Sequence, residues 1–91
     1  METARSVRPE RLTLPQAIRT RDKRIRPVIR TVEEAIRLID TELPQELQAL
    51  RRWTFARALL VEAERTRKRR DLTSAERQLK QALSNEGWLA D

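Results

Sequence analysis

The clearest pattern in the chain is a recurrence of apolar residues at intervals of three and four, which begins at residue 32. Such spacing places apolar side chains on one face of an α-helix. The first run predicts a helix over about residues 32–43, and its apolar face holds Val32, Ala35, Ile36, Ile39 and Leu43. Thr31 and Glu34 form the S/T-x-x-E capping box that starts a helix. Pro44 ends it, because the residue before a proline avoids the helical conformation.

Two further helices follow from the same spacing. The second is expected over about residues 45–69, and its apolar face consists of Leu47, Leu50, Trp53, Ala56, Leu59, Leu60 and Ala63. The third is expected over about residues 74–86, started by a second capping box that runs from Thr73 to Glu76. Gly87 would end it, since glycine is favoured at the left-handed position that follows a helix.

These helices predict an all-α fold, a small three-helix bundle in one domain over residues 31–91. The large apolar side chains on the facing stripes supply its expected core. That core consists of Val32, Ile36, Ile39, Leu43, Leu47, Leu50, Trp53, Leu59, Leu60, Leu72, Leu79, Leu83 and Trp88. It is a small core, so a homodimer that shares it is an alternative to a monomer.

The first 30 residues show no sustained period, and Pro9 and Pro15 interrupt them. They are therefore predicted to be a separate, largely disordered N-terminal arm. Apolar residues alternate briefly at 25–30, which leaves a short extended segment there as an alternative. Pro27 would confine such a segment to the edge of a sheet, because proline has no N–H to donate.

The charge of the chain is concentrated in this arm. The whole sequence carries a net charge of +6, and residues 1–30 alone hold nine Lys or Arg against three acids. Residues 31–91 hold eleven of each sign, so they are balanced. The pattern indicates a basic appendage on a neutral domain.

Basic residues in a flexible segment can neutralise the phosphates of a nucleic acid and release its counterions. The arm residues expected to do so are Arg19, Arg21, Lys23, Arg24, Arg26 and Arg30. Arginine predominates in the arm, and its planar guanidinium suits bidentate phosphate contacts. The alternative is a leader that only keeps the protein soluble.

A second basic cluster ends the second predicted helix, and its cations are Arg65, Arg67, Lys68, Arg69 and Arg70. They are expected to form a second polyanion-binding patch if the fold brings them to the same side as the arm. The alternative is a structural role, because cations at a helix C-terminus face the negative end of the helix dipole. The polar outer face of the third helix, which includes Arg77 and Gln81, is a weaker candidate for contact with base edges.

Trp53 and Phe55 are candidate anchors for a partner protein. They lie two residues apart on one helix, so they point to different sides and a single layer does not bury both. Packing of either one in the core is the alternative.

The residue types argue against catalysis. The chain contains no histidine and no cysteine, the commonest general base and the usual thiolate metal ligand. We expect no catalytic residue, no metal site, no cofactor and no small-molecule substrate. No apolar run approaches the roughly 18–20 residues of a membrane span, and the N-terminus lacks the apolar core of a secretory signal, so neither is expected. A cytoplasmic, non-enzymatic protein without membrane contact is therefore expected.

The stretch RPVIRTVEEAIRLIDTELP resembles a family of short uncharacterised proteins found mainly in rhizobia and related alphaproteobacteria. The resemblance covers about residues 26–88, and the residues that carry it are Pro27, Val28, Val32, Ala35 and Pro44. It implies a bacterial, cytoplasmic setting and a mostly helical fold that can include a short N-terminal hairpin. It supplies no catalytic or binding residue.

Two functions remain after these considerations. The first is a small helical module that binds nucleic acid or another polyanion through its basic arm, without sequence specificity. The alternative is a protein-interaction module, possibly a homodimer, whose arm only confers solubility.

Overall fold

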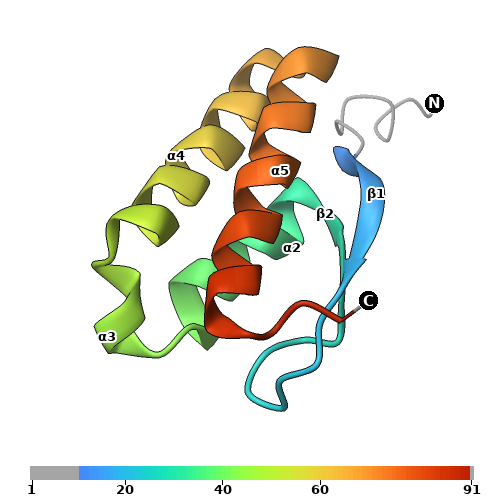
Figure 1. Cartoon of the computed structure of the whole chain (residues 1–91). Coiled ribbons are helices and arrows are strands. Elements are labelled where there is room, and N and C mark those ends of the chain that lie inside the picture. The colour runs from blue at the N-terminus through green and yellow to red at the C-terminus, as the bar shows by residue number, and fades with distance from the viewer. Residues whose placement is uncertain (1–10, 91) are drawn as a thin grey trace, which may run out of the picture.

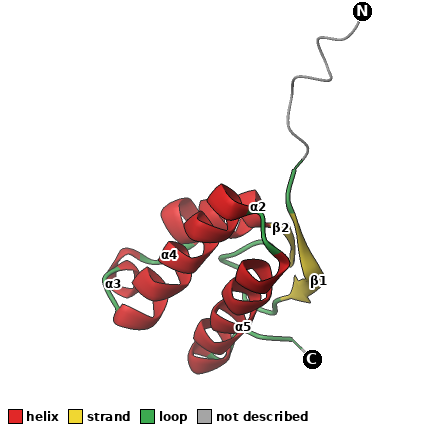
Figure 2. Ribbon diagram, turned by 90° about the horizontal axis from the view of Figure 1, so that it is seen from above, coloured by secondary structure: helices red, strands yellow, loops and turns green. Residues whose placement is uncertain are grey.

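The computed structural model describes residues 11–90 and shows a β-hairpin packed against helices (Figure 1). In chain order the elements are β1 (Thr13–Arg19), β2 (Val28–Thr31), α2 (Val32–Arg37), the π-helical segment η1 (Leu38–Glu42), α3 (Gln45–Gln48), α4 (Arg51–Thr66) and α5 (Arg69–Glu86). Around the core, α4 packs on α5, α5 on β1, β2 on α2, and α2 on α4. Figure 2 shows the resulting arrangement from above, with the hairpin beside α5 and α2.

The prediction of an all-α three-helix bundle is wrong, because the described chain is α+β. The two strands pair antiparallel, with Ile18 opposite Ile29 and Thr13 opposite Thr31. The register shifts between Thr13 and Ile18, and Gln16, midway between the buried Leu14 and Ile18, is exposed. This irregularity, which we call the bulge, interrupts the period of two by which a half-buried strand is recognised in a sequence.

The prediction of a largely disordered arm is also wrong for the residues from 11 onward, which are ordered in the hairpin. Residues 1–10, the rest of the expected arm, lie outside the described residues. The hairpin contributes Leu14, Ile18, Ile25 and Ile29 to the same core as the helices. Apolar side chains that looked scattered in the sequence are therefore buried together.

The first predicted helix starts as expected. The Glu34 N–H donates to Thr31 Oγ1 over 3.0 Å, and Glu34 Oε1 accepts from the Thr31 N–H over 3.4 Å, which completes the capping box. After Arg37 the helix widens into η1, where the Leu43 N–H donates to the Leu38 carbonyl five residues back. Pro44 then follows the extended Leu43.

The other two predicted helices have different bounds. The expected helix over 45–69 is divided into α3 and α4, and α4 ends at Thr66 because Arg67 takes the left-handed conformation, with φ at 57°. The expected helix over 74–86 begins earlier, at Arg69. Thr73 therefore lies inside α5 and caps nothing.

The end of α5 follows the prediction. Gly87 has a φ of 77°, its N–H donates to the Ser84 carbonyl, and the Trp88 N–H donates to the Leu83 carbonyl over 2.9 Å. These two bonds make a Schellman motif. Trp88 is consequently turned back toward the core, with its ring centroid 6.4 Å from that of Trp53.

The predicted core is partly confirmed. Buried as expected are Val32, Ile39, Leu43, Trp53, Leu60, Leu79, Leu83 and Trp88. Only partly buried at its edge are Ile36, Leu47, Leu50, Leu59 and Leu72. The four apolar residues of the hairpin are also buried although the helical spacing does not predict it, and so is Leu38, which lies in the π-helical turn.

Candidate functional site

The basic stretch between the two strands is a closed turn. The Thr20 N–H donates to the Pro27 carbonyl, and the Thr20 hydroxyl donates to the Arg26 carbonyl. The C-terminal segment joins it, since the Arg21 N–H donates to the Trp88 carbonyl and the Ala90 N–H donates to the Arg19 carbonyl. The turn is thus held both across the hairpin and to the end of α5.

Three of the six candidate cations in this region are engaged within the protein. The Arg21 guanidinium donates to the Leu89 carbonyl. Arg24 makes two hydrogen bonds to Asp22 and lies over the Trp88 ring at 5.3 Å. The same bonded pair lowers the pKa of Asp22, chiefly through the side-chain hydrogen bond from Arg24.

Arg26 is the third, and it is the most enclosed of them. Its side chain is 25% exposed and donates to the Glu42 carboxylate at 3.2 Å, with Glu34 at 3.8 Å. The Arg26 N–H also donates to Glu42 Oε1. An arginine held by two carboxylates fastens the hairpin to α2 and η1 and has little capacity left for phosphate.

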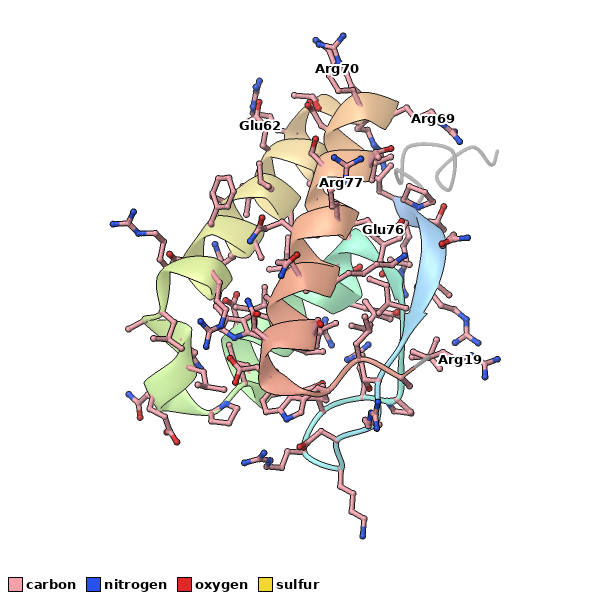
Figure 3. The ribbon with its side chains drawn as sticks, viewed as in Figure 1. Arg19, Glu62, Arg69, Arg70, Glu76 and Arg77 are labelled. Carbon is pink, nitrogen blue, oxygen red and sulfur yellow. The ribbon has the colours of Figure 1, made fainter. Side chains whose placement is uncertain are left out.

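The other three candidates of the hairpin, Arg19, Lys23 and Arg30, are exposed. Within residues 11–90 no carboxylate lies within 4.0 Å of their side-chain nitrogens. They are separated along the hairpin, with one at the end of β1, one in the turn and one on β2. Figure 3 shows Arg19 pointing away from the protein at the outer side of the sheet.

The second basic cluster lies at the turn between α4 and α5. Arg65 is bound to Glu62 by two side-chain hydrogen bonds, which raise the pKa of Arg65 and lower that of Glu62. Arg67 occupies the left-handed position that reverses the chain. The next three residues are Lys68, Arg69 and Arg70, and all three are exposed.

No carboxylate of the described chain pairs with the side chains of Lys68, Arg69 or Arg70 within 4.0 Å. Figure 3 shows Arg69 and Arg70 projecting outward from the same end of the helical pair. We call these three residues the tip patch. It is a run of three consecutive exposed cations with no paired carboxylate among the described residues, and the hairpin has no such run.

The fold keeps the two basic regions apart. The hairpin turn is bonded to residues that follow the C-terminal end of α5, whereas the tip patch lies at the start of α5. A helix of 18 residues is about 27 Å long. The hairpin turn and the tip patch therefore lie at opposite ends of the protein (Figure 1), so the cations of the turn do not form one surface with the tip patch.

The polar face of α5 is only partly free of ion pairs within the described chain. Lys80 is paired with Glu76, with a distance of 3.0 Å between Lys80 Nζ and Glu76 Oε2. Arg77, Gln81, Ser84 and Asn85 are exposed.

The two candidate anchors differ in exposure. Trp53 is fully buried, and its indole N–H donates to Glu86 Oε2 over 3.1 Å. It belongs to the core and cannot contact a partner. Phe55 is 50% exposed on the opposite side of α4 and lines a groove between α4 and α5.

The described residues contain no group of three or more His, Cys, Asp or Glu placed to hold a metal ion. Within the same residues, no helix has the length and apolar character needed to cross a membrane. No family profile, curated protein or solved structure matches the chain, so the resemblance to the rhizobial family stays a prediction.

Proposed function

We propose that the protein is a non-enzymatic module that binds the phosphate backbone of nucleic acid, without sequence specificity, through the tip patch. The observation that carries the proposal is the run of three consecutive exposed cations, Lys68, Arg69 and Arg70, with no carboxylate of the described chain paired to them. The proposal includes a cytoplasmic location and no cofactor.

Whether a cation is paired with a carboxylate determines how strongly it attracts a phosphate. A carboxylate bonded to an arginine neutralises its charge and repels a nearby phosphate, so Arg24, Arg26 and Arg65 attract a phosphate less than unpaired cations do. The tip patch has no such paired carboxylate among the described residues. Its cations can neutralise phosphates directly and release condensed counterions.

The separated cations of the hairpin have a different role in this proposal. Arg19, Lys23 and Arg30 contribute to the net charge of +6, which attracts a polyanion over long range. Their side chains are spread along the hairpin, so few of them can contact one phosphate backbone together. We expect them to affect the rate of association more than the number of phosphates neutralised.

The test compares two triple variants that lose the same charge. One replaces Lys68, Arg69 and Arg70 with glutamine, and the other replaces Arg19, Lys23 and Arg30 with glutamine. Binding of a fluorescent DNA duplex and a structured RNA is titrated between about 50 mM and about 200 mM salt. If the three tip cations neutralise phosphates, their removal makes the slope of log affinity against log salt shallower by about 2.7.

The hairpin variant should change that slope by less than about 1. An equal decrease in affinity and in salt slope in the two variants would show that only net charge matters and would contradict a site at the tip patch. Absence of binding by the unmodified protein at low salt would also overturn the proposal. Circular dichroism of both variants verifies that the fold is retained.

A further inference from the structure

A groove of about 680 Å³ runs between the outward faces of α4 and α5, away from the hairpin. Its lining residues are Arg51, Arg52, Thr54, Phe55, Ala58 and Gln78. The groove is open to solvent over Phe55, which is 50% exposed. It is separate from the tip patch, because none of Lys68, Arg69 and Arg70 lines it.

The floor of the groove is apolar. Phe55 and Ala58 are one turn apart on α4, so their side chains are neighbours on the same face. A single exposed apolar residue is ordinary, but an aromatic side chain within a concave site is typical of a docking surface. A helix of another protein fits the groove between two antiparallel helices, because its side chains can insert between theirs.

The rim of the groove is positively charged. Arg51 is exposed and has no carboxylate within ion-pair distance in the described part of the chain, and no acid is among the lining residues. Arg52 is held by Glu86 at 3.1 Å. Arg77, beside Gln78 on α5, is also exposed and shown on the outward side of that helix in Figure 3.

The pairing of the two helices places the cations at a defined separation. Arg52 contacts Glu86, and Ala58 and Gln78 line the same groove, so Arg77 lies near the level of position 60 on α4. Nine residues of helix separate that level from Arg51, which corresponds to about 14 Å along the groove.

We propose that this groove binds an acidic amphipathic helix of a partner protein. An apolar side chain of the partner packs on Phe55 and Ala58, and carboxylates on either side of it face Arg51 and Arg77. This inference goes beyond the proposed function and does not depend on it, because it uses a different surface and a different kind of ligand.

Charge complementarity distinguishes this partner from a second copy of the chain. In a two-fold pair, the grooves of both copies would face each other and bring Arg51 and Arg77 of both copies into one interface, and within the described residues only Arg52 of the lining arginines has a carboxylate partner, Glu86. The same cations favour carboxylates of a partner.

The test begins with selection from an unbiased library of random peptides displayed on phage, with the full-length protein as bait. The expected result is enrichment of sequences in which apolar residues recur at helical spacing beside Asp or Glu. The most enriched peptide is then titrated by fluorescence anisotropy. Phe55→Ser should weaken its binding by about tenfold or more, and Arg51→Glu should also weaken it.

The matched control is Val61→Ser. Val61 is 43% exposed on the same helix but does not line the groove, so its replacement should change peptide affinity by less than about twofold. Both Phe55 and Val61 are exposed, so neither change removes a core contact.

Four results would overturn the inference. They are the absence of acidic peptides among those selected, equal affinity of the Phe55→Ser variant, a dimer in sedimentation that Phe55→Ser dissociates, and single-stranded DNA binding that Phe55→Ser abolishes. The last result would identify Phe55 as a platform for base stacking. If the groove proposal is wrong, the tip-patch proposal is unaffected. The Phe55→Ser variant should bind duplex DNA as strongly as the unmodified protein.

Discussion

Individual side chains of the same type have very different roles in this protein, depending on what lies beside them. Arg26 is enclosed by two carboxylates, whereas Arg69 is exposed with no carboxylate beside it in the described residues. The sequence predicts that arginines are candidates for phosphate binding. It could not separate these two, because Glu42 is 16 residues from Arg26 and is brought to it only by folding.

The Glu34 carboxylate makes several contacts where β2 leads into α2. Its carboxylate accepts from the Arg30 N–H and the Thr31 N–H, and Arg26 lies 3.8 Å away. The pKa of Glu34 is lowered from its ordinary value, chiefly by the Arg30 backbone hydrogen bond. Both hydrogen bonds are at the junction of β2 and α2.

The lowered pKa makes stability depend on acid pH. A carboxylate with a lower pKa in the folded state contributes fully above its ordinary value of 4.5, and that contribution is lost as pH falls through the folded value. We predict that Glu34→Gln lowers the free energy of unfolding at pH 7 by about 1 kcal/mol and makes its fall below pH 4.5 less steep. Urea denaturation at several pH values measures both effects.

The control is Glu64→Gln, since Glu64 is exposed and has no ion pair within the described chain. It should change the free energy of unfolding at pH 7 by less than about 0.5 kcal/mol. An unchanged acid dependence in Glu34→Gln would refute the role assigned to this carboxylate.

At the level of elements, α5 is attached to the hairpin by the side chain of Glu76, for which the sequence predicts a different role. Glu76 looked like the end of a capping box, but it lies within α5 and its Oε1 accepts from the Gln16 N–H over 3.0 Å. Gln16 belongs to β1, at the bulge where regular pairing with β2 is interrupted. The carboxylate satisfies a strand donor that the hairpin leaves unpaired.

We predict that Glu76→Ala lowers the free energy of unfolding by about 1–3 kcal/mol, because it removes a part-buried hydrogen bond to a charged group and the ion pair with Lys80. Glu76→Gln keeps an acceptor oxygen and should lose less. Gln81→Ala, an exposed change on the same helix, should fall within about 0.5 kcal/mol of the unmodified protein. Thermal or urea unfolding gives the values, and equal effects of Ala at positions 76 and 81 would contradict the assignment.

The two capping-box motifs of the sequence differ in whether a helix begins at them. The capping box at Thr31 is real because a strand ends there and the chain turns into α2. The same motif at Thr73 has no effect, because the left-handed Arg67 and extended Lys68 already start the next helix at Arg69. The four-residue motif at Thr73 does not indicate whether the helix begins there or at Arg69.

At the scale of the whole molecule, the hairpin is an integral part of the core. Leu14, Ile18, Ile25 and Ile29 are each at most 6% exposed. Removing residues 1–30 therefore removes four buried apolar side chains, and each such loss costs about 2–5 kcal/mol. The sum, about 8–20 kcal/mol, is comparable to the total stability of about 5–15 kcal/mol that is usual for a domain.

We predict that a chain beginning at residue 31 does not unfold cooperatively, as measured by circular dichroism on heating and by the dispersion of its amide NMR signals. If this truncated chain does not bind nucleic acid, the loss of its fold explains the result. Such a result would therefore not identify the hairpin cations as the contact site. A cooperative transition close to that of the full chain would show that the hairpin is dispensable.

The sequence by itself determined the features that depend on neighbours along the chain: the capping box at Thr31, the stop at Pro44, the Schellman motif at Gly87 and the apolar stripes of the helices. Only the tertiary structure decided that the N-terminal segment is a hairpin, because a bulge hides its period and its stability comes from packing against α2 and α5. Tertiary structure also decided which arginines are paired, since ion pairs such as Arg57 with Asp40 join residues distant in sequence. Local rules fix short-range geometry, whereas burial and charge pairing are properties of the completed fold.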